Sequence, residues 1–259
     1  MRILLLLLAA LAIDAHAQGF AALVSPPRFE LRAKPGDRVR DVIEITNASA
    51  QGARYRVRTA DWTLDEATTV KFDDVLRPGS CRPWVAIERR EVNVSPGGKY
   101  RYRFEVGVPA DAPVGECRFA LLIEGDDQNV QAGGGLNFPV TGRLGIIVYV
   151  TIGDADAKLD VVSTKIANVG GEELPIVMVA NSGNAHGRLT GFLSGTDAAG
   201  KKLEFTPSTL PILPGETRAI PLTIYREKDE AVQVTYPVTI SGKLEWSAKS
   251  MPFEKRFAR

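Results

Sequence analysis

Apolar and polar side chains alternate with a period of two along residues 136–152, LNFPVTGRLGIIVYVTI. The apolar positions on one face of this stretch are Leu136, Phe138, Val140, Leu144, Ile146, Val148, Val150 and Ile152. This alternation predicts a β-strand rather than a helix. At about 3.3 Å per residue the strand would reach roughly 50 Å, which is longer than most sheets need. Because Pro139 has no N–H for a ladder, we expect the first part at a sheet edge, with an apolar row that a partner strand can pair with. A core strand interrupted at Gly142 is the alternative that the same pattern allows.

Shorter alternating runs separated by Pro, Gly, Asn and Asp occupy the rest of the chain, and no stretch has the apolar period of an amphipathic helix. We expect the remaining strands at residues 20–24, 28–31, 39–46, 55–60, 84–89, 100–108, 118–123, 159–167, 175–180, 189–194, 217–225, 232–240 and 243–246. Pro-Gly turns punctuate both halves. The sequence therefore predicts an all-β protein made of two immunoglobulin-like sandwiches.

The N-terminus has the pattern of an export signal: Arg2, an apolar run over residues 3–13, and the small-x-small sequence of residues 15–17. This run is too short to span a bilayer. We expect cleavage after residue 17, a first domain over residues 18–152, a linker at 153–157 and a second domain over 158–259. The mature protein is then exported, and we expect no membrane insertion after the signal is cleaved.

Composition removes several classes of function. The chain has 32 Lys and Arg against 31 Asp and Glu, so no global charge favours nucleic acid or an anionic membrane. His16 leaves with the signal, and we expect the remaining His186, in a string of turn formers, at the surface. Without a histidine near a nucleophile, an HExxH or paired CxxC motifs, the sequence predicts no enzyme, no metal site and no cofactor.

Two further features concern the exported state and possible ions. The only two cysteines are Cys81 and Cys117, and export permits a disulfide between them, although two buried or free thiols fit the spacing as well. The segments at residues 124–135 (EGDDQNVQAGGG) and 153–158 (GDADAK) are rich in Gly and acidic side chains. We expect a mobile loop at the first and a domain boundary at the second, with calcium binding as a weak alternative at both.

Several stretches together resemble the periplasmic pilus chaperones of the PapD-like family. They are VSPPRFEL (24–31), WVAI (84–87), VNVSPG (92–97), VPADAPVGECRF (108–119), RLGIIVYV (143–150), NSGNAHG (181–187) and ILPG (212–215). Their order and spacing cover nearly the whole mature chain. The resemblance implies two immunoglobulin-like domains in a boomerang arrangement, located in the periplasm.

The resemblance also implies a function. Such chaperones cap pilus or fimbrial subunits by donating a strand, and deliver them to an outer-membrane usher. The matching donor side chains here are Leu136, Phe138 and Val140, the apolar row already identified. Arg28 and Arg143 match the two basic residues that anchor the subunit's terminal carboxylate, a role that suits a forked guanidinium. Self-association of the unloaded protein through the donor edge is left open.

This sequence departs from the family pattern at several points. Tyr149 is followed by Val-Thr where the family has Arg-Pro, and the anchor is Arg143 where the family has lysine. Gly134 stands where a further donor would be, residues 66–82 have no counterpart, and the two cysteines do not match the family's disulfide. An exported immunoglobulin-like adhesion or surface-binding module, which uses the same edge for a permanent partner, is therefore the alternative function.

Overall fold

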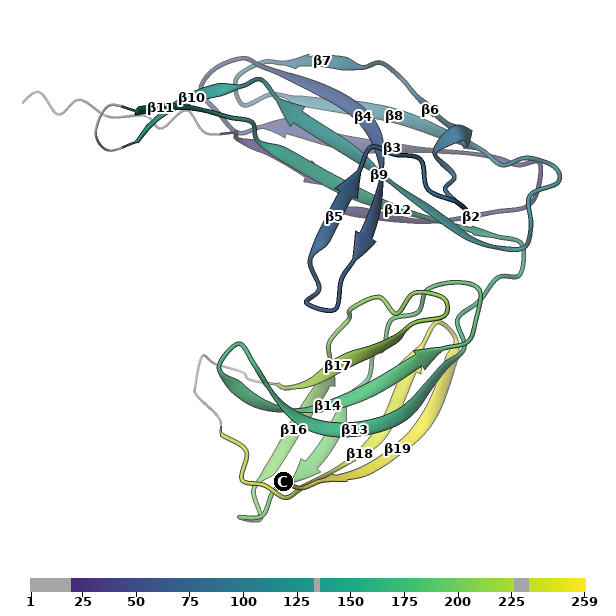
Figure 1. Cartoon of the computed structure of the whole chain (residues 1–259), viewed down its shortest axis with the longest axis vertical. Helices are drawn as coiled ribbons and strands as arrows, with labels where there is room; N and C mark the ends of the chain where they lie inside the picture. Colours follow the sequence, from purple (N-terminus) through teal and green to yellow (C-terminus); the bar gives the residue numbers. More distant parts are fainter. Residues whose placement is uncertain (1–19, 133–135, 226–232) are drawn as a thin grey trace, which may run out of the picture.

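A computed structural model describes residues 20–132, 136–225 and 233–259, so the predicted signal peptide and Gly134 lie outside the described residues. Apart from one short 3₁₀ turn, η1 (Arg82–Trp84), every regular element in these ranges is a strand, which confirms the predicted all-β fold. Figure 1 shows two β-domains joined at one side and set at an angle to each other. No helix in the described ranges could cross a membrane.

Two sheets form the N-terminal domain. The first has the order β1-β3-β8-β6 and the second has the order β2-β12-β9-β4-β5, with β7 also paired to β4. The strands of the first sheet are β1 (Ala22–Ser25), β3 (Arg38–Asn47), β8 (Lys99–Gly107) and β6 (Val85–Ile87). Those of the second are β2 (Arg28–Ala33), β12 (Arg143–Ile152), β9 (Gly115–Gly125), β4 (Ala53–Leu64), β5 (Val70–Asp73) and β7 (Glu91–Val94). Between Ser25 and Arg28 the chain passes from one sheet to the other.

The space between these two sheets is the core of the domain. From β12 it contains Ile146, Val148, Val150 and Ile152, which are the side chains that the alternation in the sequence places on one face. Cys81 and Cys117 lie in the same core and form a disulfide, as the sequence led us to expect.

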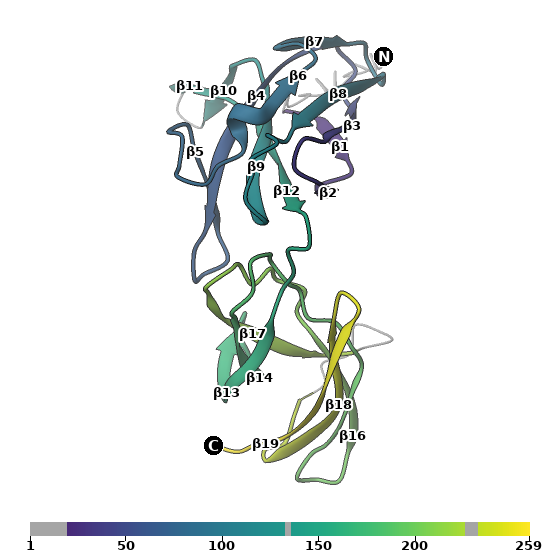
Figure 2. The same ribbon diagram turned by 90° about the vertical axis from the view of Figure 1, so that its right-hand side faces the viewer.

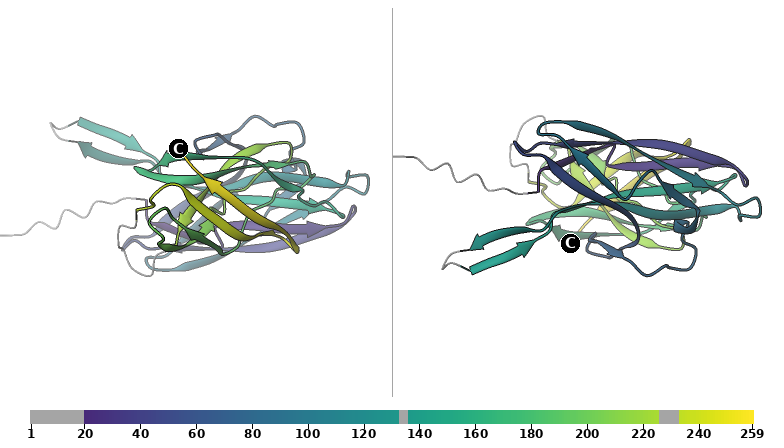
Figure 3. Two further views of the ribbon diagram at one scale, coloured as in Figure 1. Left: turned by 90° about the horizontal axis from the view of Figure 1, so that it is seen from below. Right: turned by 90° about the horizontal axis from the view of Figure 1, so that it is seen from above.

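The predicted long strand is two strands, separated at Thr141 and Gly142. Its first part, β11 (Leu136–Val140), pairs with β10 (Gln128–Ala132) in a separate two-stranded hairpin. The segment 124–135, which was expected to be a mobile loop, therefore contains a strand at residues 128–132, and the expectation of a loop is wrong there. A Cβ on Gly142 would lie 2.0 Å from the Phe20 side chain, so the chain between the two strands passes directly against that residue. The hairpin projects from the body of the molecule in both views of Figure 3.

The C-terminal domain is one seven-stranded sheet with the order β13-β14-β17-β16-β15-β18-β19. The strands are β13 (Leu159–Val169), β14 (Glu172–Asn181), β15 (Leu193–Thr196), β16 (Lys202–Pro207), β17 (Thr217–Ile224), β18 (Val238–Trp246) and β19 (Lys249–Phe257). The sheet folds back around its own core, so that β13 approaches β19. Two donors from the β18–β19 hairpin, Trp246 Nε1 at 3.3 Å and Lys249 Nζ at 3.1 Å, bind the Ala157 carbonyl just before β13.

A third apolar cluster joins the two domains. Ala60, Trp62, Leu122 and Tyr149, on the face of the six-stranded sheet that points away from the first core, pack with Leu213 of the C-terminal domain. Figure 2 shows the β4 end of this sheet reaching down to the strands of the lower domain. The outer face of the six-stranded sheet is therefore partly an interface within the chain.

Candidate functional site

The β10–β11 hairpin carries an exposed apolar row. Phe138 and Val140 are 50% and 49% exposed, and Phe138 stands opposite Val130 in the register of the hairpin. Leu136 begins β11, but its side chain lies outside the described residues. Two large apolar side chains at alternate positions of one strand form a row that an additional strand could cover.

The edge of β12 continues the free edge of β11. On one side β12 pairs with β9 along its whole length, from Arg143 opposite Glu124 to Ile152 opposite Gly115. On the other side β2 pairs with it only from Ile147 onward. Among the described residues no strand pairs with residues 143–146 on the β2 side, because β1 belongs to the other sheet. We call this unpaired stretch, together with the free edge of β11, the vacant lane.

The two arginines proposed as a carboxylate anchor lie on one face of the sheet but apart from each other. Arg28 stands opposite Ile147, and Ile147 is four residues, about 13 Å, along β12 from Arg143. Each guanidinium already has a carboxylate: Arg28 Nε is 2.9 Å from Glu30 and Arg143 Nε is 2.6 Å from Glu124. Their joint role as an anchor stays a prediction.

An aromatic ring stands between the two arginines. Gly145 lies on the same face as Arg143 and Ile147, and a Cβ on it would be 2.0 Å from the ring of Phe72. Phe72 belongs to β5, within the stretch 66–82 for which the sequence offered no counterpart. The β4–β5 hairpin thus lies over the part of the face between Arg28 and Arg143.

The tip of that hairpin binds the C-terminal domain. Arg218 of β17 donates to the Asp65 carbonyl at 3.0 Å and to the Leu64 carbonyl at 3.4 Å, and it pairs with Glu216 at 3.0 Å. The Arg218 side chain is buried in this position. The hairpin therefore connects the domains at a second place, away from the linker.

The predicted surface histidine is buried where the domains meet. The His186 side chain is 8% exposed and stacks on Tyr149 with ring centroids 3.8 Å apart. Its backbone N–H donates to Glu116 at 3.1 Å, and its Nδ1 is 2.5 Å from the same oxygen. The expectation of a surface position is wrong because the turn that carries His186 folds into the first domain, which a local turn pattern does not reveal.

Charged groups from both domains surround this histidine. His186 Nε2 is 3.7 Å and Arg188 Nε is 3.6 Å from Glu30 Oε1, the oxygen that Arg28 also contacts. Arg188 additionally donates to the Tyr149 hydroxyl at 3.3 Å and to the Thr209 carbonyl at 2.7 Å. We call Arg28, Glu30, His186 and Arg188 the junction cluster.

The junction cluster favours the ionised forms of Glu30 and His186. The nearby His186 imidazole, helped by Arg28 and opposed by burial, lowers the pKa of Glu30 to about 2. Burial alone would lower the pKa of His186, but the hydrogen bonds with Glu116 and Glu30 outweigh it and raise that pKa. Burial lowers the pKa of Arg188 and raises that of Tyr149 to about 12. The cluster is thus an environment that stabilises a carboxylate.

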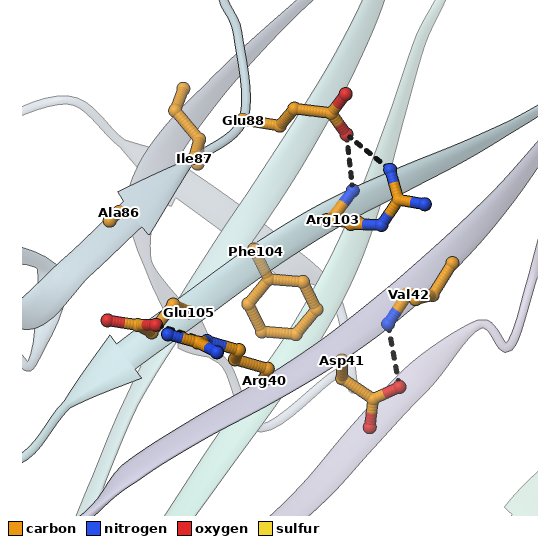
Figure 4. Close-up of a pocket in the computed structure, with 9 residues that line it drawn as sticks. All are labelled: Arg40, Asp41, Val42, Ala86, Ile87, Glu88, Arg103, Phe104 and Glu105. Atoms are coloured by element: carbon orange, nitrogen blue, oxygen red, sulfur yellow. Dashed lines mark hydrogen bonds and ion pairs between the residues drawn. The ribbon is translucent and has the colours of Figure 1, made fainter.

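A separate hollow of about 610 Å³ lies over β3, β8 and β6 in the other sheet. Figure 4 shows that its charged side chains already have partners, including Asp41, which accepts from the backbone N–H of Val42. Arg40 binds Glu105, and Glu88 binds both Arg103 and the Tyr100 hydroxyl. Because its charges are satisfied within the sheet, this hollow does not add a candidate reaction centre.

The acidic segments are held by local partners. Asp126 pairs with Arg54 at 3.0 Å, Asp127 accepts from Thr141, and Asp156 pairs with Lys249 at 2.7 Å. In the part of the chain that the structure describes, no group of three or more His, Cys, Asp and Glu side chains could hold a metal ion.

Comparisons with known proteins find a similar fold but no similar sequence. No protein family and no curated protein matches the chain. Among solved structures, the class 5 fimbriae chaperone CfaA is 12% identical with a TM-score of 0.47, over 92% of this chain and 99% of that one. The chain resembles fimbrial chaperones over most of its length.

Two complexes give similar values. A chain from the CsuC–CsuE chaperone–tip adhesion subunit complex of Acinetobacter baumannii is 13% identical to this chain, with a TM-score of 0.44. The match covers 92% of this chain and 98% of that one. A chain from the complex of the SafA pilin with the SafB chaperone of Salmonella enterica is 10% identical to this chain, with a TM-score of 0.46. The match covers 92% of this chain and 97% of that one. Identities and TM-scores this low do not establish a shared function. Any function must therefore be argued from the site.

Proposed function

We propose that this protein is a periplasmic chaperone that caps pilus or fimbrial subunits by donor-strand complementation and passes them to an outer-membrane usher. The observation that carries the proposal is the vacant lane with its exposed apolar row, Phe138 and Val140. An unpaired edge beside exposed apolar side chains is normally an aggregation hazard, and it is tolerated where a partner strand is meant to bind.

The energetics favour a strand as the partner. Covering Phe138 and Val140 would each contribute about 1 kcal/mol, roughly half of the value for full burial of such a side chain, because both are already half buried in the free protein. The open backbone groups of β11 and of residues 143–146 would supply ladder hydrogen bonds. A subunit that lacks one strand of its own fold offers the matching groove and the matching unpaired edges.

The class of subunit follows from the resemblance of the sequence to PapD-like chaperones. Export to the periplasm follows from the predicted signal at residues 1–17. Two separate hydrophobic cores, one ending at Ile152 and the other beginning at Ala157, support a division of the chain into two domains near residues 153–157. No step of this mechanism needs a cofactor or covalent chemistry.

Co-expression in a bacterial periplasm tests the proposal. The mature protein is produced with small exported subunits encoded beside it, and soluble complexes are recovered by pull-down. Phe138→Asp places a charge in the apolar row, so we expect it to abolish recovery of a one-to-one complex. Phe192→Asp is the matched control, because Phe192 is 77% exposed but belongs to the C-terminal domain.

Each outcome of the pull-down has a defined meaning. Loss with Phe138→Asp and retention with Phe192→Asp, both folded by circular dichroism, supports strand donation. Equal recovery of both variants, or no subunit bound by the wild type, contradicts it. The adhesion or surface-binding alternative would then be the better description of the exposed edge.

A further inference from the structure

One aromatic ring lies against the base of the β10–β11 hairpin. The two legs of the hairpin leave the sheet at Gly125 and Gly142, where the Gly125 N–H donates to the Gly142 carbonyl at 3.0 Å. A Cβ on Gly142 would lie 2.0 Å from the Phe20 side chain, and a Cβ on Gly125 would lie 2.8 Å from it. Neither glycine has a positive φ, so the backbone conformation does not require glycine at these positions. The space that Phe20 occupies accounts for both glycines.

The position of Phe20 is fixed by the body of the domain. Its ring meets the Tyr55 ring edge to face, with the two centroids 6.0 Å apart. The next residue is tied to the first sheet, because the Ala48 N–H donates to the Ala21 carbonyl at 2.7 Å. Phe20 also packs against the core between the two sheets. The ring therefore supports the base of the hairpin from the core side.

A second contact holds the hairpin base on the opposite face of the sheet. Arg54 of β4 binds Asp126 through a forked contact, with Nη2 3.0 Å from Oδ1 and Nε 3.2 Å from both carboxylate oxygens. Because side chains alternate along a strand, Asp126 points to the face opposite its neighbour Gly125. One residue further along, Asp127 accepts a hydrogen bond from Thr141 of the other leg.

We propose that Phe20 and Arg54 are positioning residues for strand donation, which hold the base of the β10–β11 hairpin from the two faces of the sheet and so aim Phe138 and Val140 at a partner. The inference rests on the chaperone function above and adds two residues to it. Both lie outside the hairpin itself, so the alternation of apolar residues along the hairpin does not point to them.

The orientation of the hairpin depends on its base, because the hairpin projects from the body of the molecule (Figure 3). Within the described residues, β10 and β11 form a sheet of their own and pair only with each other. Phe138 is four residues, about 13 Å, from Gly142, so a swing of about 20° at the base would move it by roughly 4–5 Å. Neighbouring strands of a sheet are about 4.8 Å apart. Such a swing would displace the apolar row by a full strand position.

A fixed orientation matters for affinity. A partner strand can pair with β11 and with residues 143–146 of β12 together only while the hairpin continues the edge of β12. If a loosened base leaves the hairpin in that orientation for about a tenth of the time, the apparent affinity for the partner falls about tenfold. Holding the hairpin in place before the partner arrives avoids this loss, which is the general advantage of preorganisation.

Distances between two spin labels test these contacts without a subunit. The labels are attached to cysteines introduced at Gln131, near the far end of β10, and at Arg101, which is exposed on β8 of the first sheet. The native cysteines are bonded to each other, so they take no label. Double electron–electron resonance then gives the distribution of distances between the hairpin and the body in the full mature chain.

We expect a narrow distribution for the wild type and a roughly twofold broader one for Phe20→Ala and for Arg54→Gln, because few other contacts hold the base. Phe20→Leu keeps a large apolar side chain on the two glycines and should restore the narrow distribution. Arg56→Gln is the matched control for Arg54, because Arg56 is exposed on the same face of β4 and forms no salt bridge within the described ranges. Phe192→Ala, at a side chain that is 77% exposed on the C-terminal domain, is the control for Phe20.

Capture of the subunit should follow the same order. Relative affinity is measured by competition, in which a tagged variant and the untagged wild type share a limiting amount of subunit in one periplasm. Phe20→Ala and Arg54→Gln should bind about tenfold more weakly, and Phe20→Leu and Arg56→Gln should bind as the wild type does. Arg54 is exposed, so its variant should unfold in urea as the wild type does. That variant remains informative if Phe20→Ala does not fold.

Three results would overturn the inference: unchanged distributions in both Phe20→Ala and Arg54→Gln, equal broadening in Arg56→Gln, or full capture by variants whose hairpin distribution has broadened. In each case strand donation stands as long as Phe138→Asp abolishes capture. If the wild type captures no subunit, the chaperone function fails instead, and the distances alone decide whether the two contacts fix the hairpin.

Discussion

Two hairpins extend from the six-stranded sheet of the N-terminal domain, and they have opposite surroundings. The β10–β11 hairpin projects from the body with Phe138 and Val140 about half exposed. The β4–β5 hairpin folds back over the sheet, where Phe72 lies on Gly145 and the tip accepts hydrogen bonds from Arg218. One hairpin is free at its outer edge, and the other is fixed at both its side and its tip.

The difference shows that strand pattern alone does not decide what a hairpin does. Both carry apolar side chains at alternate positions, and in β5 the ring of Phe72 lies against Gly145, which leaves room for it. The fixed hairpin contacts the C-terminal domain through Arg218, and under the proposed function the free hairpin keeps its apolar row for a partner. The following predictions test that division, beginning with the largest effect.

Removing the disulfide next to the fixed β4–β5 hairpin should cause the largest loss of stability. Cys81 follows the β5 segment and joins it to β9 across a separation of 36 residues. Cys81→Ser with Cys117→Ser should lower the free energy of unfolding by about 2–5 kcal/mol, because the unfolded chain regains the freedom that the loop removed. Guanidinium unfolding of the oxidised wild type and the variant measures this, and a loss below about 1 kcal/mol would contradict it.

Gly145→Val should displace the fixed hairpin. A Cβ there would be 2.0 Å from the Phe72 ring, so we expect a loss of roughly 1–3 kcal/mol from overpacking. Adding Phe72→Ala should recover part of that loss, which a double-mutant cycle in urea would measure. Gly52→Val is the matched control, because a Cβ at Gly52 meets nothing within 4 Å. Equal losses at both glycines would refute the proposed contact.

Arg218→Met should weaken the bridge at the tip by roughly 1–2 kcal/mol, since two carbonyls and Glu216 lose a charged donor. The same change should broaden the distribution of interdomain distances seen by small-angle scattering. Exposed Arg101→Met serves as the control. An unchanged scattering profile in Arg218→Met would show that the tip contact does not fix the domains.

His186 at the domain junction should make the free energy of unfolding decrease as pH rises, by less than the substitutions above. His186 faces Glu116 from β9, Glu30 from β2 and Tyr149 from β12, with Arg188 beside it, and its pKa is raised in the folded state. The stabilisation is therefore complete below the unfolded pKa of about 6.5 and decreases as pH rises through the folded value. Urea midpoints measured from about pH 6 upward, where Glu30 is ionised in both the folded and the unfolded chain, should show this decrease, and His186→Gln should flatten it. An increase with pH in that range would contradict the sign.

Phe138→Ser should have the smallest effect on stability, within about 0.5 kcal/mol, because the side chain is half exposed in the free protein. The same change should reduce binding of a subunit severely. A large loss of stability in urea would mean that Phe138 supports the fold itself, and the contrast between the two hairpins would disappear.

The alternation of apolar residues was sufficient to predict the fold class and the core face of β12. Ile146, Val148 and Val150 are buried as that pattern requires, and the cysteines are bonded. The exposed row at Phe138 and Val140 was also predictable, since Pro139 makes an interior strand unfavourable. These are properties that neighbouring residues of one strand determine together.

Contacts between distant residues could not be predicted in the same way. His186 lies in a turn, and only the fold brings Glu116 and Glu30 to it. The role of Gly145 depends on Phe72, 73 positions earlier in the chain, and the strand β10 arises in a segment whose composition resembles a loop. The resemblance to PapD-like chaperones implies that Arg28 and Arg143 act as a pair, whereas in the fold each guanidinium has its own carboxylate.

The passage of the chain from β1 to β2 limits the length of a strand that can pair with the free edge. β2 begins its pairing with β12 at Arg28, opposite Ile147. A strand added beside β11 and β12 therefore cannot extend past that residue. From Leu136 to Ile146 the available edge measures roughly 35 Å at about 3.3 Å per residue. The edge therefore sets a maximum length for the paired strand. A longer segment of a partner would have to bend away or leave its last residues unpaired.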